Sequence, residues 1–145
     1  GRGKLGKKPR KCPTEHEEQV ALITWAATQP ALDTLFAIPN GGFRSYTTAK
    51  KLKAEGCKPG VSDLLWPCPL HRWHGLWIEM KALDGTLTAD QEDWLRRMKG
   101  EGYATVVAYG CTAAQLAIAD YKENSMHHHD GSGSPYYLTY HARRS

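Results

Sequence analysis

The sequence contains no apolar run that approaches the roughly 20 residues a membrane-spanning helix requires, and no segment has the pattern of a secretory signal. Its four cysteines are scattered and form no Cys-x-x-Cys pair. We therefore expect reduced thiols, no association with a membrane and a cytoplasmic location. No internal repeat is apparent, and 145 residues fit one globular domain.

Acidic side chains are missing from the first eleven residues, which hold six basic ones: Arg2, Lys4, Lys7, Lys8, Arg10 and Lys11. The whole chain has a net charge of +4, so the remainder carries a net charge of −2. This distribution excludes a uniformly basic nucleic-acid binder. Residues 1–13 are expected to form a disordered basic arm, which either contacts phosphates or only solvates the chain.

The composition is that of a globular domain, with 41% hydrophobic and 23% charged residues. Apolar periodicity and turn residues predict helices at residues 14–28, 45–55, 88–99 and 112–122, and strands at residues 35–38, 61–66, 75–82 and 104–109. This order indicates an α/β domain at residues 14–122, in which a small mixed sheet of about four strands is flanked by helices. Residues 123–145 are expected to be a tail or linker, with residues 136–140 either an added strand or unordered.

Three helix starts share a capping-box pattern, in which a threonine is followed three residues later by Glu or Gln. The pairs are Thr14 with Glu17, Thr88 with Gln91, and Thr112 with Gln115. Gly56 and Gly100 are the expected stops of the second and third helices.

Charged side chains interrupt the two apolar runs at residues 61–66 and 75–82. If these runs form an antiparallel hairpin with its turn near His71, facing positions add up to about 142, and Asp63 lies opposite Glu79. Alternation then puts Asp63, Glu79 and Lys81 on one face of the sheet. Two facing carboxylates repel each other, and a divalent cation such as Mg²⁺ between them would remove the conflict. The lysine could orient a water molecule or stabilise charge on a phosphate.

These residues resemble the D…(D/E)-x-K signature of the PD-(D/E)xK nuclease superfamily. The surrounding blocks are more similar to the VRR-NUC family: TEHEEQ, IPNGGFR, KLKAEGCKPGVSDL, GLWIEMKALDGTLTADQEDWL and GYATVVAYG. The resemblance covers residues 14–122. The pattern D…ExK is common by chance, whereas the ordered set of blocks is specific. Small stand-alone members of this family resemble phage or prophage enzymes, which act in a bacterial host cell.

The resemblance implies a restriction-endonuclease-like core and a magnesium or manganese ion held by Asp63, Glu79 and the Met80 carbonyl. Lys81 would take part in catalysis. In this family a glutamate of the first helix, followed four residues later by a glutamine, belongs to the active site; Glu15 and Gln19 match that pattern. Glu18 competes with Glu15 for this role. The alternative is an acidic first turn that the helix dipole favours.

The substrate-binding candidates come from the resemblance and from a cluster of basic residues. The resemblance places Asn40, Arg44 and Gln91 near the substrate, although Gln91 also has an ordinary role as a cap partner. Lys50, Lys51 and Lys53 belong to the basic cluster of the body. That cluster is either a DNA-backbone footprint or a solvated helix face.

The spacing Cys68-x-x-His71-x-x-His74 suggests zinc ligands, but no fourth ligand with paired spacing is evident. The favoured function is a metal-dependent DNA endonuclease. By analogy with the family it would be selective for branched, flap or junction DNA, and it would act as a homodimer if both strands are cut. The alternatives are a non-catalytic DNA-binding accessory module with the same fold, and a structural domain in which Lys81 neutralises a buried ion cluster.

Overall fold

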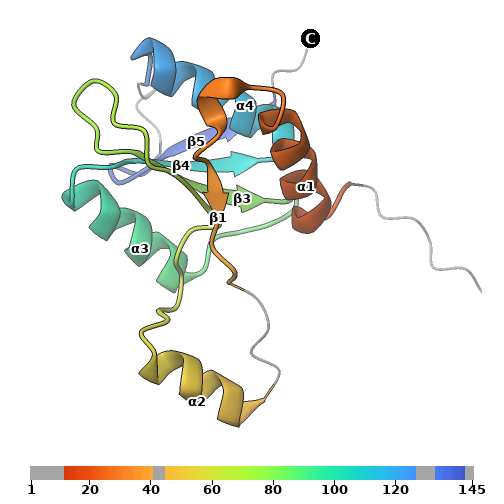
Figure 1. The fold of residues 1–145 in the computed structure, drawn as a ribbon, viewed down its shortest axis with the longest axis vertical. Coiled ribbons are helices and arrows are strands. Elements are labelled where there is room, and N and C mark those ends of the chain that lie inside the picture. Colours follow the sequence, from red (N-terminus) through yellow and green to blue (C-terminus); the bar gives the residue numbers. More distant parts are fainter. Residues whose placement is uncertain (1–11, 41–44, 127–132, 143–145) are drawn as a thin grey trace, which may run out of the picture.

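The computed structural model describes residues 12–40, 45–126 and 133–142, which form one five-stranded mixed sheet with four α-helices (Figure 1). The strands are β1 (Phe36–Ala37), β2 (Leu64–Trp66), β3 (Leu76–Lys81), β4 (Ala104–Tyr109) and β5 (Leu138–His141), in that spatial order. The helices are α1 (Glu15–Ala26), α2 (Tyr46–Ala54), α3 (Ala89–Gly100) and α4 (Cys111–Glu123), with a short 3₁₀ helix at Pro30–Leu32. The first three strands are antiparallel neighbours, whereas β3, β4 and β5 run parallel. The predicted α/β class and mixed sheet are confirmed.

The sheet has a fifth strand because the segment after α4 returns to it. The β5 strand pairs in parallel with β4, and its Tyr140 is buried with its hydroxyl donating a hydrogen bond to Asp120 Oδ2 at 2.8 Å. Residues 138–141 therefore belong to the sheet, although the sequence left residues 123–145 as a tail of unknown order.

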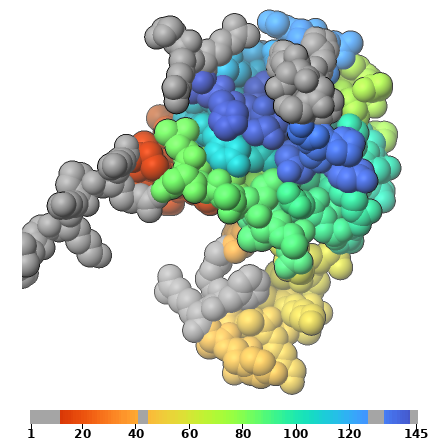
Figure 2. Space-filling model, turned by 180° about the vertical axis from the view of Figure 1, so that it is seen from behind, coloured from red at the N-terminus to blue at the C-terminus, as the bar shows by residue number. Residues whose placement is uncertain are grey.

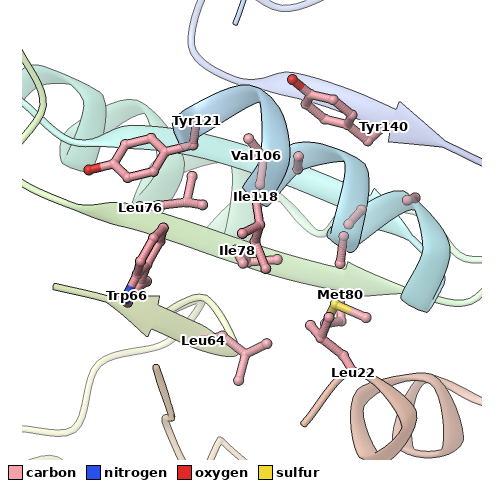
Figure 3. Close-up of a cluster of buried hydrophobic side chains, with 14 of the residues drawn as sticks. Leu22, Leu64, Trp66, Leu76, Ile78, Met80, Val106, Ile118, Tyr121 and Tyr140 are labelled. Atoms are coloured by element: carbon pink, nitrogen blue, oxygen red, sulfur yellow. The ribbon is translucent and has the colours of Figure 1, made fainter. Parts of the chain in front are cut away.

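The main core lies between one sheet face and the helices α1 and α4 (Figure 3). Alternate residues of β3, Leu76, Ile78 and Met80, point into it and are fully buried. They meet Leu22 of α1 and Ile118 of α4. Odd-numbered residues of β3 face the other way, where Trp77 packs edge-on against Trp94 of α3, with ring centroids 5.5 Å apart. The two faces of β3 are thus covered by different helices, as period-two alternation requires.

Two of the three expected helix caps form. Thr14 Oγ1 accepts the N–H of Glu17 at 3.1 Å, and Thr88 and Gln91 make a complete capping box at the start of α3. The third prediction is wrong: the N-cap of α4 is Gly110, two residues before Thr112, and the helix has no side-chain cap from Thr112. A carboxylate of α1 binds the first N–H of α4 instead.

Helix α2 projects from the body of the molecule (Figures 1 and 2). It contains no buried residue. Ser45 caps its start, and its end follows the prediction: Gly56 adopts φ +101°, and the N–H of Cys57 reaches back to the Leu52 carbonyl at 3.0 Å. In the part of the chain that the structure describes, no helix is both long and apolar enough to cross a membrane.

Candidate active site

The β2–β3 hairpin has the register that the sequence predicts. Leu64 pairs with Ile78, Leu65 with Trp77 and Trp66 with Leu76, so each pair adds up to 142. Continuing this register by one residue sets Asp63 opposite Glu79. The Oδ2 atom of Asp63 accepts a hydrogen bond from the backbone N–H of Met80 at 2.7 Å. The Asp63 carboxylate is therefore fixed against β3, next to Glu79.

Glu79 is a carboxylate enclosed by protein. Its exposed fraction is 1%, and its Oε2 atom has no hydrogen-bond partner among the described residues. Burial, and secondly the neighbouring Asp63, raise the pKa of Glu79 to about 9. Burial also raises the pKa of Asp63, although the Met80 N–H acts in the opposite direction. A buried carboxyl with an unpartnered oxygen beside a second carboxyl is an environment that a bound cation would stabilise.

Lys81 is the cation that the protein itself supplies. Its side chain is 6% exposed, and its Nζ atom lies 3.7 Å from Glu15 Oε1 and 3.9 Å from Glu79 Oε1. One ammonium group thus lies near two carboxyl groups. Its positive charge lowers the pKa of Glu79, but by less than burial raises it. The site keeps an excess of negative charge when its carboxyls are ionised.

The two glutamates that compete in the first helix have different surroundings. Glu15 projects toward Lys81 and is about half exposed, at 49%. Glu18 instead accepts the N–H of Cys111 at the start of α4. Because the first N–H groups of a helix lack intrahelical partners, Glu18 acts as the cap that Thr112 does not provide. The geometry therefore favours Glu15 as the site residue and gives Glu18 a structural role.

An open cleft of about 800 Å³ reaches this site at Glu15 and Asp63, and it brings together five of the predicted residues: Glu15, Gln19, Asn40, Asp63 and Gln91. The Asn40 amide donates to the Val61 carbonyl at 2.5 Å, so Asn40 also holds the segment that leads to Asp63. Gln91 serves as the cap partner of Thr88 and still lines the cleft.

The remaining substrate-binding candidates lie elsewhere. Lys50, Lys51 and Lys53 are exposed on α2 and do not line the cleft. Arg44 and the basic residues of the first eleven positions fall outside the described residues.

Gly60 positions the site, and it is not among the site residues predicted from the sequence. Its φ is +78°, and a Cβ atom there would lie 2.2 Å from the Asp90 carbonyl oxygen. Only glycine allows the segment before Asp63 to approach the start of α3 so closely. The sequence feature that could have indicated this role is a glycine between Pro59 and the apolar run that begins at Val61.

The Cys-His-His spacing does not build a zinc site. His71 Nε2 lies within hydrogen-bonding distance of the Tyr121 and Lys122 carbonyls, at 3.0 and 3.1 Å, and His74 packs edge-on against Tyr103. Across the described ranges, no group of three or more His, Cys, Asp or Glu side chains is placed to hold a metal ion.

Magnesium requires less from the protein than zinc does. It usually binds through one or two carboxylates and completes its octahedron with water and substrate phosphates. Asp63 and Glu79 supply two carboxylates, and Met80, whose carbonyl is the expected third ligand, is tied to Asp63 through its N–H. The unpartnered Oε2 of Glu79 has no other described function. The residues present therefore fit a Mg²⁺ or Mn²⁺ ion.

The mixed sheet, with acidic residues and a lysine on the strands of its central hairpin, is a restriction-endonuclease-like fold. The family model of the VRR-NUC domain matches residues 7–112, and the chain belongs to this family. A solved structure described as a "VRR_NUC domain protein" has a TM-score of 0.69 and 29% sequence identity, and the match covers 78% of this chain and 91% of that one. No curated protein sequence matches the chain. Family and fold together make it a nuclease-type DNA-processing domain.

Proposed function

We propose that the protein is a Mg²⁺- or Mn²⁺-dependent endonuclease that hydrolyses phosphodiester bonds in DNA. The observation that carries this proposal is the pair of carboxyls at the β2–β3 hairpin. Asp63 is fixed by the Met80 N–H at 2.7 Å, and the adjacent Glu79 is buried with an unpartnered oxygen. A pure DNA binder has no use for carboxylates that repel phosphate in its cleft.

Asp63, Glu79 and the Met80 carbonyl would hold the ion, with Glu15 completing the set directly or through water. A bound divalent ion polarises the scissile phosphate and lowers the pKa of a coordinated water. Lys81 lies between Glu15 and Glu79, so its ammonium group is placed to orient the attacking water or to stabilise charge that develops on the phosphate. Burial of Lys81 strengthens this interaction, because the local dielectric constant is lower than in water.

The substrate is expected to enter through the open cleft, which Gln19, Asn40 and Gln91 line together with Glu15 and Asp63. The lysines of α2 would contact the DNA backbone. Further candidates for this contact are Arg44 and the basic residues of the first eleven positions. We propose branched, flap or junction DNA as the preferred substrate. One domain has one such site, so cutting both strands symmetrically requires a homodimer.

The proposal is tested by cleavage of three labelled DNAs, a plain duplex, a flap and a four-way junction, each in EDTA, Mg²⁺ or Mn²⁺. Asp63→Asn is the sharpest variant, because it removes the charge but keeps an oxygen that can accept the Met80 N–H. Asp93→Asn is its control, since Asp93 is an exposed carboxylate that pairs with Arg96 on α3.

We expect metal-dependent cleavage that Asp63→Asn abolishes and Asp93→Asn retains. Binding of these DNAs without cleavage in any metal would contradict the proposal and favour the accessory DNA-binding module. Full activity of Asp63→Asn would contradict the metal assignment.

A further inference from the structure

Helix α2 makes little use of its surface for packing. Of its nine residues none is buried, and only Ala49 and Leu52 are half-buried. The space-filling view shows it as a lobe that projects from the body (Figure 2). An isolated helix of this length is marginal in water, so a bound partner would stabilise it.

One face of α2 combines an aromatic ring with positive charge. Tyr46, Lys50 and Lys53 are spaced i, i+4 and i+7, which places them on the same side of the helix. The half-buried Ala49 lies beside this face, and the half-buried Leu52 lies farther round the helix. Tyr46 is 83% exposed, the highest value among the large hydrophobic side chains that the structure describes.

This combination matches the chemistry of single-stranded DNA. Lysine ammonium groups pair with phosphates, and an aromatic ring stacks on the face of a base. In a duplex the base faces are covered by neighbouring base pairs, so only an unpaired base offers such a face. A lipid anchor would need several exposed apolar side chains on one helix face, and this face of α2 has only Tyr46.

The chain ties α2 to the cleft at both ends. Asn40 precedes the helix and Asp63 follows it, and both residues line the cleft. A strand held on α2 would therefore be bound by a segment that is joined through the chain to two residues of the cleft. We propose that Tyr46 stacks on an unpaired base, and that α2 thereby selects DNA with single-stranded character beside the cleft. This inference rests on the proposed function for the choice of DNA as ligand.

The test measures binding rather than cleavage, with the full chain in EDTA. The probes are a single strand, a duplex of the same length and a flap, each carrying the fluorescent base 2-aminopurine, whose emission is quenched when it stacks. The variants are Tyr46→Ala, Tyr46→Phe and Lys50→Ala. Tyr136→Ala is the matched control, because Tyr136 is an exposed tyrosine, at 46%, near β5 at the far edge of the sheet.

We expect Tyr46→Ala to weaken binding of the single strand and the flap by roughly 5- to 150-fold, the range for loss of one base–aromatic stack. Duplex binding and the salt dependence should not change, and the quenching should disappear. Tyr46→Phe should behave like the wild type, because it keeps the ring. Lys50→Ala should weaken all three DNAs and lower the salt slope by about 0.7 for the single strand.

Equal losses on duplex and single strand, no loss in Tyr46→Ala, or unchanged quenching would overturn the inference. The inference would also be overturned if the wild type bound unpaired DNA no more tightly than duplex DNA. Metal-dependent cleavage that persists in any of these cases would leave the proposed nuclease intact. Conversely, binding that depends on Tyr46 without cleavage in any metal would contradict only the nuclease.

Discussion

The backbone N–H of Met80 donates a hydrogen bond to Asp63 Oδ2 at 2.7 Å, so a carboxylate from the residue before β2 is anchored on β3. This bond holds Asp63 beside the buried Glu79 before any ligand arrives. Two carboxyls kept together in this way raise the free energy of the metal-free protein when both are ionised. Binding of a divalent cation would recover that free energy, which links stability, pH and metal affinity at one site.

Glu79→Gln should stabilise the metal-free protein, by about 1–3 kcal/mol near neutral pH, because the amide needs no proton on folding, whereas Glu79 must take up a proton to be buried in its neutral form. The pKa of Glu79 rises from 4.5 to about 9 on folding. The folded state thus binds more protons between these values, and the stability of the wild type falls as pH rises through this window. The gain in Glu79→Gln should therefore grow from pH 5 to pH 9. The measurement is denaturant unfolding in EDTA.

The exposed Asp93→Asn variant serves as the control, because the pKa of Asp93 is lowered by Arg96 rather than raised. A pH-independent difference between Glu79→Gln and the wild type would show that Glu79 is ionised in the folded protein.

Mg²⁺ or Mn²⁺ should raise the melting temperature of the wild type but not of Asp63→Asn or Glu79→Gln. An ion present at a hundredfold excess over its dissociation constant stabilises the folded state by about 2.7 kcal/mol. Because the ion competes with a proton on Glu79, its affinity should increase with pH. Thermal unfolding in a metal titration at two pH values measures both effects. An equal shift in all three proteins would place the ion elsewhere.

Substitutions of Glu15 and Glu18, which are three residues apart, should have different effects: the first on cleavage and the second on stability. Glu15→Gln should reduce cleavage with little effect on the unfolding free energy, since Glu15 is half exposed and contacts Lys81. Glu18→Ala should destabilise the protein by about 0.5–2 kcal/mol, the usual cost of losing a helix cap, because the N–H of Cys111 loses its acceptor. Cleavage rates and urea midpoints of both variants test this. The opposite outcome would restore Glu18 as the site residue.

Lys81→Ala should lower the cleavage rate by about 10²–10³-fold, the cost of removing one donor that stabilises transition-state charge. Metal affinity should change much less, because Lys81 is not a ligand. Lys81→Arg is the matched variant, since it keeps the charge next to Glu15 and Glu79. Single-turnover rates and metal titrations distinguish the two roles, and a larger effect on metal affinity than on rate would make Lys81 a structural residue.

The parts that the sequence predicts well are those set by local patterns. Strand alternation and the position of the turn define the β2–β3 register, and hence the face that carries Asp63 and Glu79. The capping box of α3 is likewise contained in four residues, from Thr88 to Gln91.

The parts that could not be predicted depend on contacts between distant residues. Glu18 caps a helix that begins 93 residues later, and no local pattern announces such a bond. The β5 strand has little apolar pattern of its own and is stabilised by pairing with β4 and by the contact of Tyr140 with Asp120. The position of α2 outside the body could also not be predicted from the sequence, because helical periodicity does not indicate which element the helix packs against.

Two glycines that follow the end of α2 provide the last test, because both adopt positive φ but only one has close neighbours. A Cβ atom at Gly56 would meet nothing within 4 Å, whereas one at Gly60 would lie 2.2 Å from the Asp90 carbonyl oxygen. Gly56→Ala should therefore cost only the backbone strain of about 1–2 kcal/mol. Gly60→Ala should cost more and also reduce metal binding, because the chain from Val61 to Asp63 must move away from α3. Urea unfolding and metal titration of both variants measure the difference. Equal stability losses with intact metal binding would show that Gly60 is not needed to place Asp63.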